Sequence, residues 1–246
     1  MKILVCISKT PDTTEKISFT PDNKEFNANG VQYILNPYDE WYSLVRALEL
    51  TEKHGGSVTA INVGPADNET LIRKALAIGA ADAVRIDAQP GSAFFVAKQI
   101  AEYARGKDFD AIFCGKETID YNGSEVGPMI AEILDLPFLS FVNHIELDGR
   151  NARASRDIEG GTEVVETELP FVLSAAKGLA EQRIPNMMGI MKAKQKPLQV
   201  IAPVPFDDKA KVAVYELPPS KSSVRLIEPE NMDELVRLLH EEAKVI

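Results

Sequence analysis

The sequence contains few of the residues that build metal sites or thiol chemistry. Among its 246 residues there are only two cysteines, Cys6 and Cys114, and three histidines. The cysteines are far apart in the sequence and each lies in an apolar run, so they predict neither a disulfide framework nor a thiolate metal cluster. We expect both to be buried as small hydrophobic side chains. The histidines lack the close spacing to other ligands that a zinc or iron site requires, and we assign no metal.

Basic charge and long apolar runs are scarce as well. Lys+Arg 27 against Asp+Glu 37 leaves a formal net charge of -10 at pH 7, which repels nucleic-acid backbones and anionic lipid surfaces. No apolar run is long enough to cross a bilayer, and neither a signal peptide nor a basic amphipathic leader precedes the first apolar run. We therefore expect neither nucleic acid nor membrane as a partner, and a location in the bacterial cytoplasm.

The usual signatures of catalysis are missing too. No G-x-G-x-x-G follows the first apolar run and no Walker lysine pattern occurs, which argues against a nicotinamide cofactor and against phosphoryl transfer. No Ser/His/Asp or Cys/His set can be picked out. The sequence therefore predicts a protein without catalytic residues of its own.

The sequence does contain short β-branched apolar runs that alternate with helix-period segments. This alternation is typical of parallel strands joined by crossover helices, and it predicts a doubly wound, mostly parallel α/β sheet. We expect strands over 3–8, 57–63, 83–87 and 111–114. After Pro137 four more strand-like runs follow over 141–147, 153–158, 163–168 and 171–175, which predict antiparallel strands appended to the sheet.

The last part of the chain has a different character, and we predict two domains. Residues 1–198 form the nucleotide-binding α/β domain, and residues 199–246 form a C-terminal arm. From Glu181 onward the prolines interrupt any long element, and we expect a helix only over 232–243, capped by Asn231 with Glu234 three residues on. The apolar residues between 212 and 227 favour wrapping around a partner over disorder.

The most informative loop follows the fourth expected strand. Ligands of open parallel sheets bind past the carboxyl ends of the strands. Residues 115–126 combine glycines, a lysine, hydroxyls and an amide just before a predicted helix, so backbone N–H groups could hold a phosphate. Any strand-to-helix connection needs turn residues, however, and composition alone leaves the two interpretations equal. Glu117, Asp120 and Glu125 count against a highly charged ligand.

A methionine-rich segment over 184–196 is the second candidate for function. Its apolar side chains, Met187, Met188, Ile190 and Met191, are bracketed by proline, glycine and lysines, and such segments suit adaptable contacts with partners. The spacing equally fits a short amphipathic helix that closes the core. If exposed, the segment would be a docking surface.

Five ordered segments resemble the beta subunit of electron transfer flavoproteins. The most specific is residues 156–174, which read RDIEGGTEVVETELPFVLS. The others are residues 36–39 (NPYD), 73–80 (RKALAIGA), Gly115-Lys116 with Ile119-Asp120, and 190–194 (IMKAK). The resemblance implies a heterodimer in which the alpha subunit holds the redox FAD, while the beta subunit binds AMP structurally and embraces alpha with its arm. It further implies acyl-CoA dehydrogenases as electron donors and a quinone oxidoreductase as acceptor.

The resemblance also assigns residues to these roles. Met187 occupies the position, usually leucine, that enters a pocket of the dehydrogenase, and Met188 and Ile190 flank it. Arg156 and Asp157 fall at the contact with the alpha subunit, although Asp157 could equally be a solvated strand charge. The AMP-contacting positions are Cys6, Asn36, Pro37, Tyr38, Asp39, Val63, Gly115, Lys116, Glu117, Thr118, Ile119, Asp120, Tyr121, Asn122, Gly123, Ser124, Glu125 and Val126.

Two alternatives stay open. A branch of the same family binds a second FAD at the AMP position and bifurcates electrons; Val126-Gly127-Pro128 resembles that branch, whereas residues 121–124 depart from it. We favour AMP because a diphosphate would meet more repulsion from the nearby carboxylates. A stand-alone nucleotide sensor resembling universal stress proteins is more distant, since it leaves the arm and the methionine segment unexplained.

Overall fold

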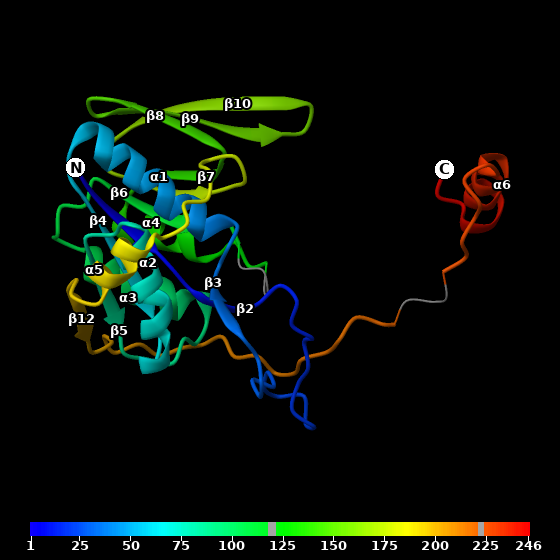
Figure 1. The fold of residues 1–246 in the computed structure, drawn as a ribbon, viewed down its shortest axis with the longest axis horizontal. Helices are drawn as coiled ribbons and strands as arrows, with labels where there is room; N and C mark the ends of the chain where they lie inside the picture. Colours follow the sequence, from blue (N-terminus) through cyan, green and yellow to red (C-terminus); the bar gives the residue numbers. More distant parts are fainter. Residues whose placement is uncertain (118–121, 221–223) are drawn as a thin grey trace. The chain divides into compact units, whose positions relative to one another are not determined.

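The computed structural model describes residues 1–117, 122–220 and 224–246 (Figure 1). The chain divides into two compact units: Met1–Ile17 with Asn27–Ala213, and Ser18–Phe26 with Val214–Ile246. We describe them as the α/β unit and the tail unit. In the described part of the chain, no helix combines the length and apolar character needed to cross a membrane.

The α/β unit is built on a seven-stranded sheet with the order β12-β5-β4-β1-β6-β11-β7. Every neighbouring pair runs parallel, which confirms the predicted doubly wound α/β fold. The strands are β1 Lys2–Cys6, β4 Ser57–Val63, β5 Asp82–Ile86, β6 Ala111–Gly115, β7 Phe138–Val142, β11 Phe171–Ala175 and β12 Leu198–Ile201.

Helices cover both faces of this sheet because its strands are apolar on both faces. Along β1, Ile3 and Val5 point into one hydrophobic cluster while Leu4 and Cys6 point into the other. The first cluster receives α1 (Asp39–His54) and α2 (Glu69–Ile78), the second α3 (Ala93–Ala104) and α4 (Val126–Leu134). A short 3₁₀ helix, η1 (Ala66–Asn68), precedes α2.

Two small antiparallel sheets complete the β structure. One has the order β10-β9-β8, from β8 His144–Asp148, β9 Asn151–Ile158 and β10 Gly161–Glu168, and lies at the top of Figure 1. The other pairs β2 (Lys9–Pro11) with β3 (Tyr33–Leu35). The predicted antiparallel addition is thus confirmed for β8 to β10.

Two of the four expected antiparallel strands need correction. The run over 171–175 is β11, which lies parallel between β6 and β7. All five of its residues are buried, as in a central parallel strand covered on both faces. The run over 141–147 is divided between β7 and β8, which belong to different sheets. Phe141, inside β7, has a φ of 58°, and the pairing of β7 with β11 shifts register nearby.

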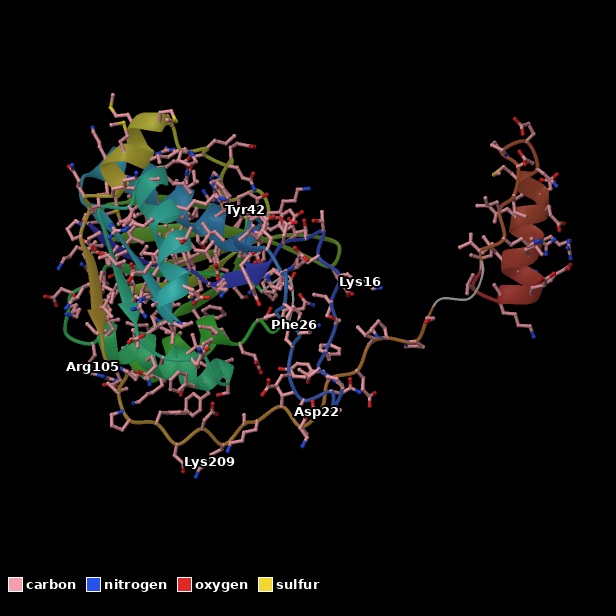
Figure 2. The ribbon with its side chains drawn as sticks, turned by 60° about the horizontal axis from the view of Figure 1, so that its bottom comes forward. Lys16, Asp22, Phe26, Tyr42, Arg105 and Lys209 are labelled. Carbon is pink, nitrogen blue, oxygen red and sulfur yellow. The ribbon has the colours of Figure 1, made fainter. Side chains whose placement is uncertain are left out.

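The chain after Glu181 is more regular than its prolines predict. It forms the helix α5 (Met187–Ala193) and then β12, the edge strand beside β5. An extended segment that carries Lys209 follows β12 (Figure 2). It is held to α3, because the Val204 N–H donates to Gln99 Oε1 at 2.7 Å and the Ser92 N–H donates to Asp208 Oδ2 at 2.8 Å.

The tail unit contains few buried side chains. Phe19 stacks on Tyr215 with 4.9 Å between ring centroids, and the Tyr215 N–H donates to the Asn23 carbonyl at 2.8 Å. The expected C-terminal helix is present as α6 (Met232–Arg237), continued by one π-helical segment, η2 (Leu238–Ala243).

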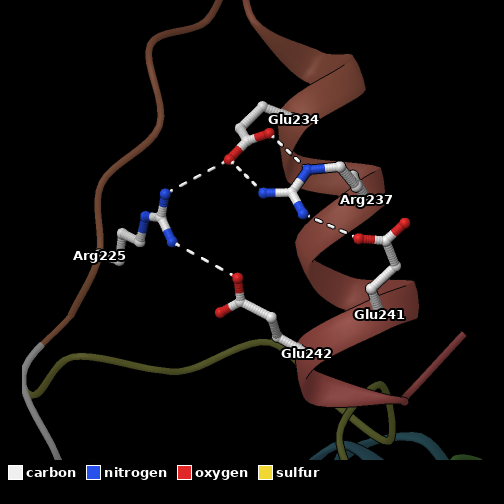
Figure 3. A network of polar contacts seen from close by, with 5 residues as sticks. All are labelled: Arg225, Glu234, Arg237, Glu241 and Glu242. Atoms are coloured by element: carbon white, nitrogen blue, oxygen red, sulfur yellow. Dashed lines mark hydrogen bonds and ion pairs between the residues drawn. The ribbon is translucent and has the colours of Figure 1, made fainter.

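The prediction that Asn231 caps this helix was wrong. Asn231 precedes α6 but its side chain makes no capping hydrogen bond. Glu234 instead binds Arg237 at 2.8 Å and Arg225 at 3.3 Å, in the ion-pair network of Figure 3. Because all these side chains are partly exposed, each pair contributes little to stability.

Candidate functional site

The predicted nucleotide positions gather where the strand order reverses. From β1 the sheet continues through β4 and β5, and from β6 it continues through β11 and β7. Ligands of open α/β sheets bind at the carboxyl ends of the strands at such a point. Cys6, Val63 and Gly115 are the last residues of β1, β4 and β6. We call these strand ends and their adjoining loops the switch point.

The Asn36 to Asp39 turn is tied to the loop after β6. The Asn36 amide donates to the Glu117 carbonyl at 3.0 Å, and the Glu117 N–H donates to Asp39 Oδ2 at 2.8 Å. The structure therefore brings these predicted positions together across 81 and 78 residues of sequence. Burial raises the pKa of the Asp39 carboxyl, and the neighbouring charge of Glu117 adds to this effect. Tyr38 lies half exposed at the start of α1.

Glu40 is a buried acid at the switch point that the sequence analysis missed. Its carboxylate accepts from the Ser8 N–H at 2.6 Å and from the Ser8 hydroxyl at 2.7 Å, just after β1. The backbone of β6 passes so close that a Cβ on Gly115 would lie 2.9 Å from Glu40 Cγ and 3.1 Å from Asp39 Cβ. The signal that could have revealed the acid is the Asp-Glu pair in the first turn of α1, where the helix dipole favours negative charge.

Cys6 and Cys114 are neighbours on the sheet. Both are buried, as expected, and their sulfur atoms lie 3.6 Å apart. The contact follows from the register, in which Val5 of β1 pairs with Phe113 of β6. The hydrogen bond from Cys114 and burial raise the pKa of the Cys6 thiol well above its usual range. Sequence distance hid this contact because strand order and register are tertiary properties.

Two asparagines fix the ends of β1 and β4. The Asn62 amide donates to the Ile7 carbonyl at 2.9 Å, and the Asn68 amide donates to Asn62 Oδ1 at 3.0 Å. A Cβ on Gly64 would lie 1.9 Å from Asn68 Nδ2, so only glycine fits between them. These residues were also missed, although a polar residue in an apolar strand run is a readable signal.

The loop that follows β6 leads into α4. Lys116 forms an ion pair with Glu117 at 2.8 Å, and the Ser124 hydroxyl donates to the Lys116 carbonyl at 2.9 Å. Asn122 and Gly123 are exposed, Glu125 precedes the helix, and Val126 begins it. The side chain of Glu125, at the N-cap of α4, makes no capping hydrogen bond. Four predicted positions, Thr118, Ile119, Asp120 and Tyr121, lie outside the described residues.

The methionine segment is a helix whose apolar side chains face solvent. Met187 is 74% exposed, Met188 64% and Ile190 42%, whereas Ala193 is buried. Figure 2 shows the sulfur atoms of this helix, in yellow, on side chains that point away from the sheet. The segment is therefore helical, as one alternative predicted, but its methionines do not close the core. They form an exposed apolar surface.

Arg156 and Asp157 point to opposite sides of β9. The Arg156 guanidinium pairs with Glu163 and donates to the Ser140 hydroxyl, and it lines a cavity of about 90 Å³ between β7 and β9. Asp157 is exposed. The structure thus leaves Asp157 accessible to a partner and gives Arg156 partners within the chain.

Comparison with known proteins decides the family. Residues 25–205 match the electron transfer flavoprotein domain. The electron transfer flavoprotein subunit beta of Bacillus subtilis (strain 168) is 37% identical over 260 residues, covering 100% of both chains. The chain belongs to the electron transfer flavoprotein beta-subunit family. The human electron transfer flavoprotein subunit beta is 31% identical over 255 residues, which cover 100% of this chain and 99% of the relative.

Another relative in this family carries a different name. The acryloyl-CoA reductase electron transfer subunit gamma of Anaerotignum propionicum is 35% identical over 208 residues, covering 82% of this chain and 77% of the relative. Membership in the electron transfer flavoprotein family makes the chain an electron-carrier subunit and implies an alpha subunit as its partner. The nucleotide, docking and interface roles of the residues described above stay predictions.

Proposed function

We propose that this electron transfer flavoprotein beta subunit binds AMP at the switch point and docks acyl-CoA dehydrogenase-type donors through α5. FAD on the alpha subunit then carries the electrons onward to a quinone oxidoreductase. The observation that carries the proposal is the convergence of the strand ends, the Asn36 to Asp39 turn and the start of α4 at one edge of the sheet. Such an edge is the standard nucleotide position in doubly wound folds.

The charges at the switch point favour a single phosphate. Carboxylates already accept the hydrogen bonds of the backbone N–H groups of Ser8 and Glu117. The donors that a phosphate could use are the first N–H groups of α4, assisted by Lys116, whose charge is shared with Glu117. A second phosphate would add another negative charge beside the same carboxylates, and each close pair of like charges is unfavourable by about 1–4 kcal/mol.

The FAD-binding alternative draws on Val126-Gly127-Pro128. Each of the last two residues has a structural reason of its own here. A Cβ on Gly127 would lie 3.0 Å from the Phe138 ring, so close packing of α4 on β7 calls for glycine. Pro128 lies in the first turn of α4, where proline costs no hydrogen bond. The motif therefore does not by itself favour a diphosphate ligand.

The docking role rests on how α5 is held. The Asn186 side chain accepts from the Gly189 N–H at 2.8 Å and caps the helix. Arg73 of α2 donates to the carbonyls of Ala193 at 2.9 Å and Lys196 at 2.7 Å. A helix whose backbone is already held needs no ordering of its main chain on docking, which lowers the entropic cost of docking.

The nucleotide proposal is tested by composition. The chain is co-expressed with its alpha subunit, the heterodimer is purified and denatured, and released AMP and FAD are quantified. One FAD with one AMP per heterodimer is expected. Two FADs without AMP would establish the bifurcating alternative, and a complex that releases no adenine nucleotide beyond one FAD would contradict binding at the switch point.

The docking proposal is tested by electron transfer. Butyryl-CoA dehydrogenase reduced with butyryl-CoA serves as the donor, and reduction of the heterodimer's flavin is followed by absorbance. Met187→Ala should raise the half-saturating heterodimer concentration by about tenfold, since a buried apolar anchor contributes roughly 1–3 kcal/mol. Gln195→Ala, at an exposed neighbour just after α5, is the matched control and should leave transfer unchanged. Equal rates for Met187→Ala and wild type at all concentrations would refute docking through α5.

A further inference from the structure

Half of the methionines in this chain lie exposed in a single short helix. Of six methionines, Met187 is 74% exposed, Met188 64% and Met191 68%. Met1 and Met129 are partly buried against the two hydrophobic clusters. Because oxidation of a thioether by a small oxidant requires access to the sulfur, the three α5 methionines are the most accessible targets in the α/β unit.

The contacts that hold α5 do not involve these thioethers. The two Arg73 hydrogen bonds hold backbone carbonyls at the end of the helix, Ala193 is buried, and Asn186 caps the first turn. Gly189 packs against α2 so tightly that a Cβ there would lie 2.5 Å from the Ala77 carbonyl oxygen. A change confined to the methionine sulfurs therefore alters the exposed surface while the α/β unit keeps its packing.

Lys196 fastens the far end of the same segment. Its ammonium donates to the carbonyls of Leu76 at 2.8 Å and Ala80 at 2.6 Å, at the end of α2. Burial lowers the pKa of Lys196, with a smaller contribution from the charge of Lys192. The platform under the methionines is thus anchored on both sides by groups that hydroperoxides do not oxidise.

We propose that Met187, Met188 and Met191 form a reversible oxidation site through which hydroperoxides turn off docking of the electron donor. The inference rests on the proposed docking role of α5. In the forward step the thioether sulfur attacks the distal oxygen of hydrogen peroxide, the O–O bond breaks, the S–O bond of the sulfoxide forms, and water leaves. The sulfur loses two electrons and the peroxide gains them.

The reverse step restores the surface. A dithiol reductant of the methionine sulfoxide reductase class removes the sulfoxide oxygen as water, and the two thiols are oxidised to a disulfide. The sulfoxide is polar and accepts hydrogen bonds, so burying it in an apolar pocket carries the desolvation cost of an unpaired polar group. Leucine has similar volume and no such chemistry, which makes Met→Leu a matched substitution.

The experiment uses the purified heterodimer and graded hydrogen peroxide. Peptide mass spectrometry measures sulfoxide at each methionine, and transfer from butyryl-CoA dehydrogenase reduced with butyryl-CoA is measured on the same samples. We expect Met187, Met188 and Met191 to oxidise before Met1 and Met129. We expect the half-saturating heterodimer concentration to rise by about tenfold. Treatment with both sulfoxide reductase classes and dithiothreitol should restore it.

The triple variant M187L/M188L/M191L tests whether these three methionines, and no other group, cause the loss of transfer after peroxide treatment. It retains Met232, which is 46% exposed in the tail unit. The variant is compared with itself before and after peroxide treatment, and its half-saturating concentration should not change. An equal loss in variant and wild type would overturn the inference by placing the sensitive group elsewhere. Unchanged transfer by wild type with all three methionines oxidised would also overturn it.

The docking role itself is judged separately by Met187→Ala without peroxide. If Met187→Ala transfers normally, docking through α5 is wrong and the inference falls with it. If Met187→Ala is impaired while oxidised wild type is not, docking stands and only the oxidation site is wrong.

Discussion

Gly115 is the residue on which the geometry of the switch point depends most directly. Its missing side chain leaves room for the acidic start of α1, where Asp39 and Glu40 approach β6. The carboxylates in turn hold the N–H groups of Ser8 and Glu117. A glycine at a strand end is easily read from sequence as a turn residue, whereas its reason here is close approach of another element.

We expect Gly115→Ala to lower the free energy of unfolding by ~1–3 kcal/mol, the usual cost of overpacking a filled site. The added methyl group also displaces Asp39 and Glu40, so less AMP should remain with the purified heterodimer. Gly161→Ala is the matched control, because a Cβ there would meet nothing within 4 Å. Denaturant unfolding and nucleotide content are measured for both variants; equal values for the two would show that Gly115 is not constrained by the acids.

Asp39 links the same site to pH. Burial and the charge of Glu117 raise its pKa in the folded chain, so the folded state binds this proton more tightly than the unfolded state. Lowering the pH through the folded-state pKa therefore adds stability through Asp39, and the gain is complete below the unfolded value. Above the folded-state pKa the carboxylate is ionised in both states, and it lowers the free energy of unfolding by an amount that no longer changes with pH.

The Asp39→Asn variant should lack this pH-dependent gain. Its unfolding free energy is compared with that of wild type between pH 7 and pH 4, and the difference should shift in favour of wild type as the pH falls. Asp148→Asn, at an exposed position, is the control. A difference between wild type and Asp39→Asn that is constant with pH would contradict the assignment.

At the level of elements, the sequence predicts strands better than it predicts their partners. The run at β4 is predicted with its observed ends, because alternation of apolar residues and glycine stops are local signals. The direction of β11 was missed because pairing is decided by β6 and β7, which flank it in space. A short run that is apolar throughout is compatible with either direction, and only its complete burial shows that it is central.

The sequence also predicts some parts of the candidate site better than others. The positions taken from family motifs, Asn36, Gly115 and the start of α4, lie at one edge of the sheet, and their contact with a nucleotide stays a prediction. Glu40 was missed because a charged residue next to a helix start is usually solvated, and only the tertiary contact with Ser8 explains its burial. Composition alone also left open whether the methionine segment was buried. The exposure of Met187, Met188 and Met191 answers that question.

The cap of α5 provides a test at this scale. Asn186→Ala removes the acceptor of the Gly189 N–H and should destabilise the helix by about 0.5–2 kcal/mol. Hydrogen exchange at the amides of α5 should accelerate correspondingly, while exchange in β1 and β6 stays unchanged. Gln195→Ala is again the control. Unaltered exchange in α5 would show that Arg73 and Lys196 hold the helix without its cap.

For the whole molecule, the apolar side chains that form the folded core and those that stay exposed lie in different parts of the sequence. Both hydrophobic clusters draw on residues no later than Ile201. In the tail unit, by contrast, Leu217 is 57% exposed, Val224 79% and Leu226 88%. Apolar side chains that one chain leaves exposed in such density are typical of a surface that a partner covers. The alpha subunit implied by the family is the natural candidate.

A chain ending at Ala213 tests this division. Because the clusters remain complete, residues 1–213 should keep the circular dichroism of the α/β unit when co-expressed with the alpha subunit. The truncated chain should fail to copurify with alpha, since an interface that loses several apolar anchors loses roughly 1–3 kcal/mol for each. The full-length chain with Glu230→Ala, at an exposed polar position of the tail unit, is the control and should copurify fully. Full recovery of an FAD-loaded complex with the Ala213 truncation would show that the α/β unit alone carries the interface, and that the exposed apolar residues of the tail unit have another purpose.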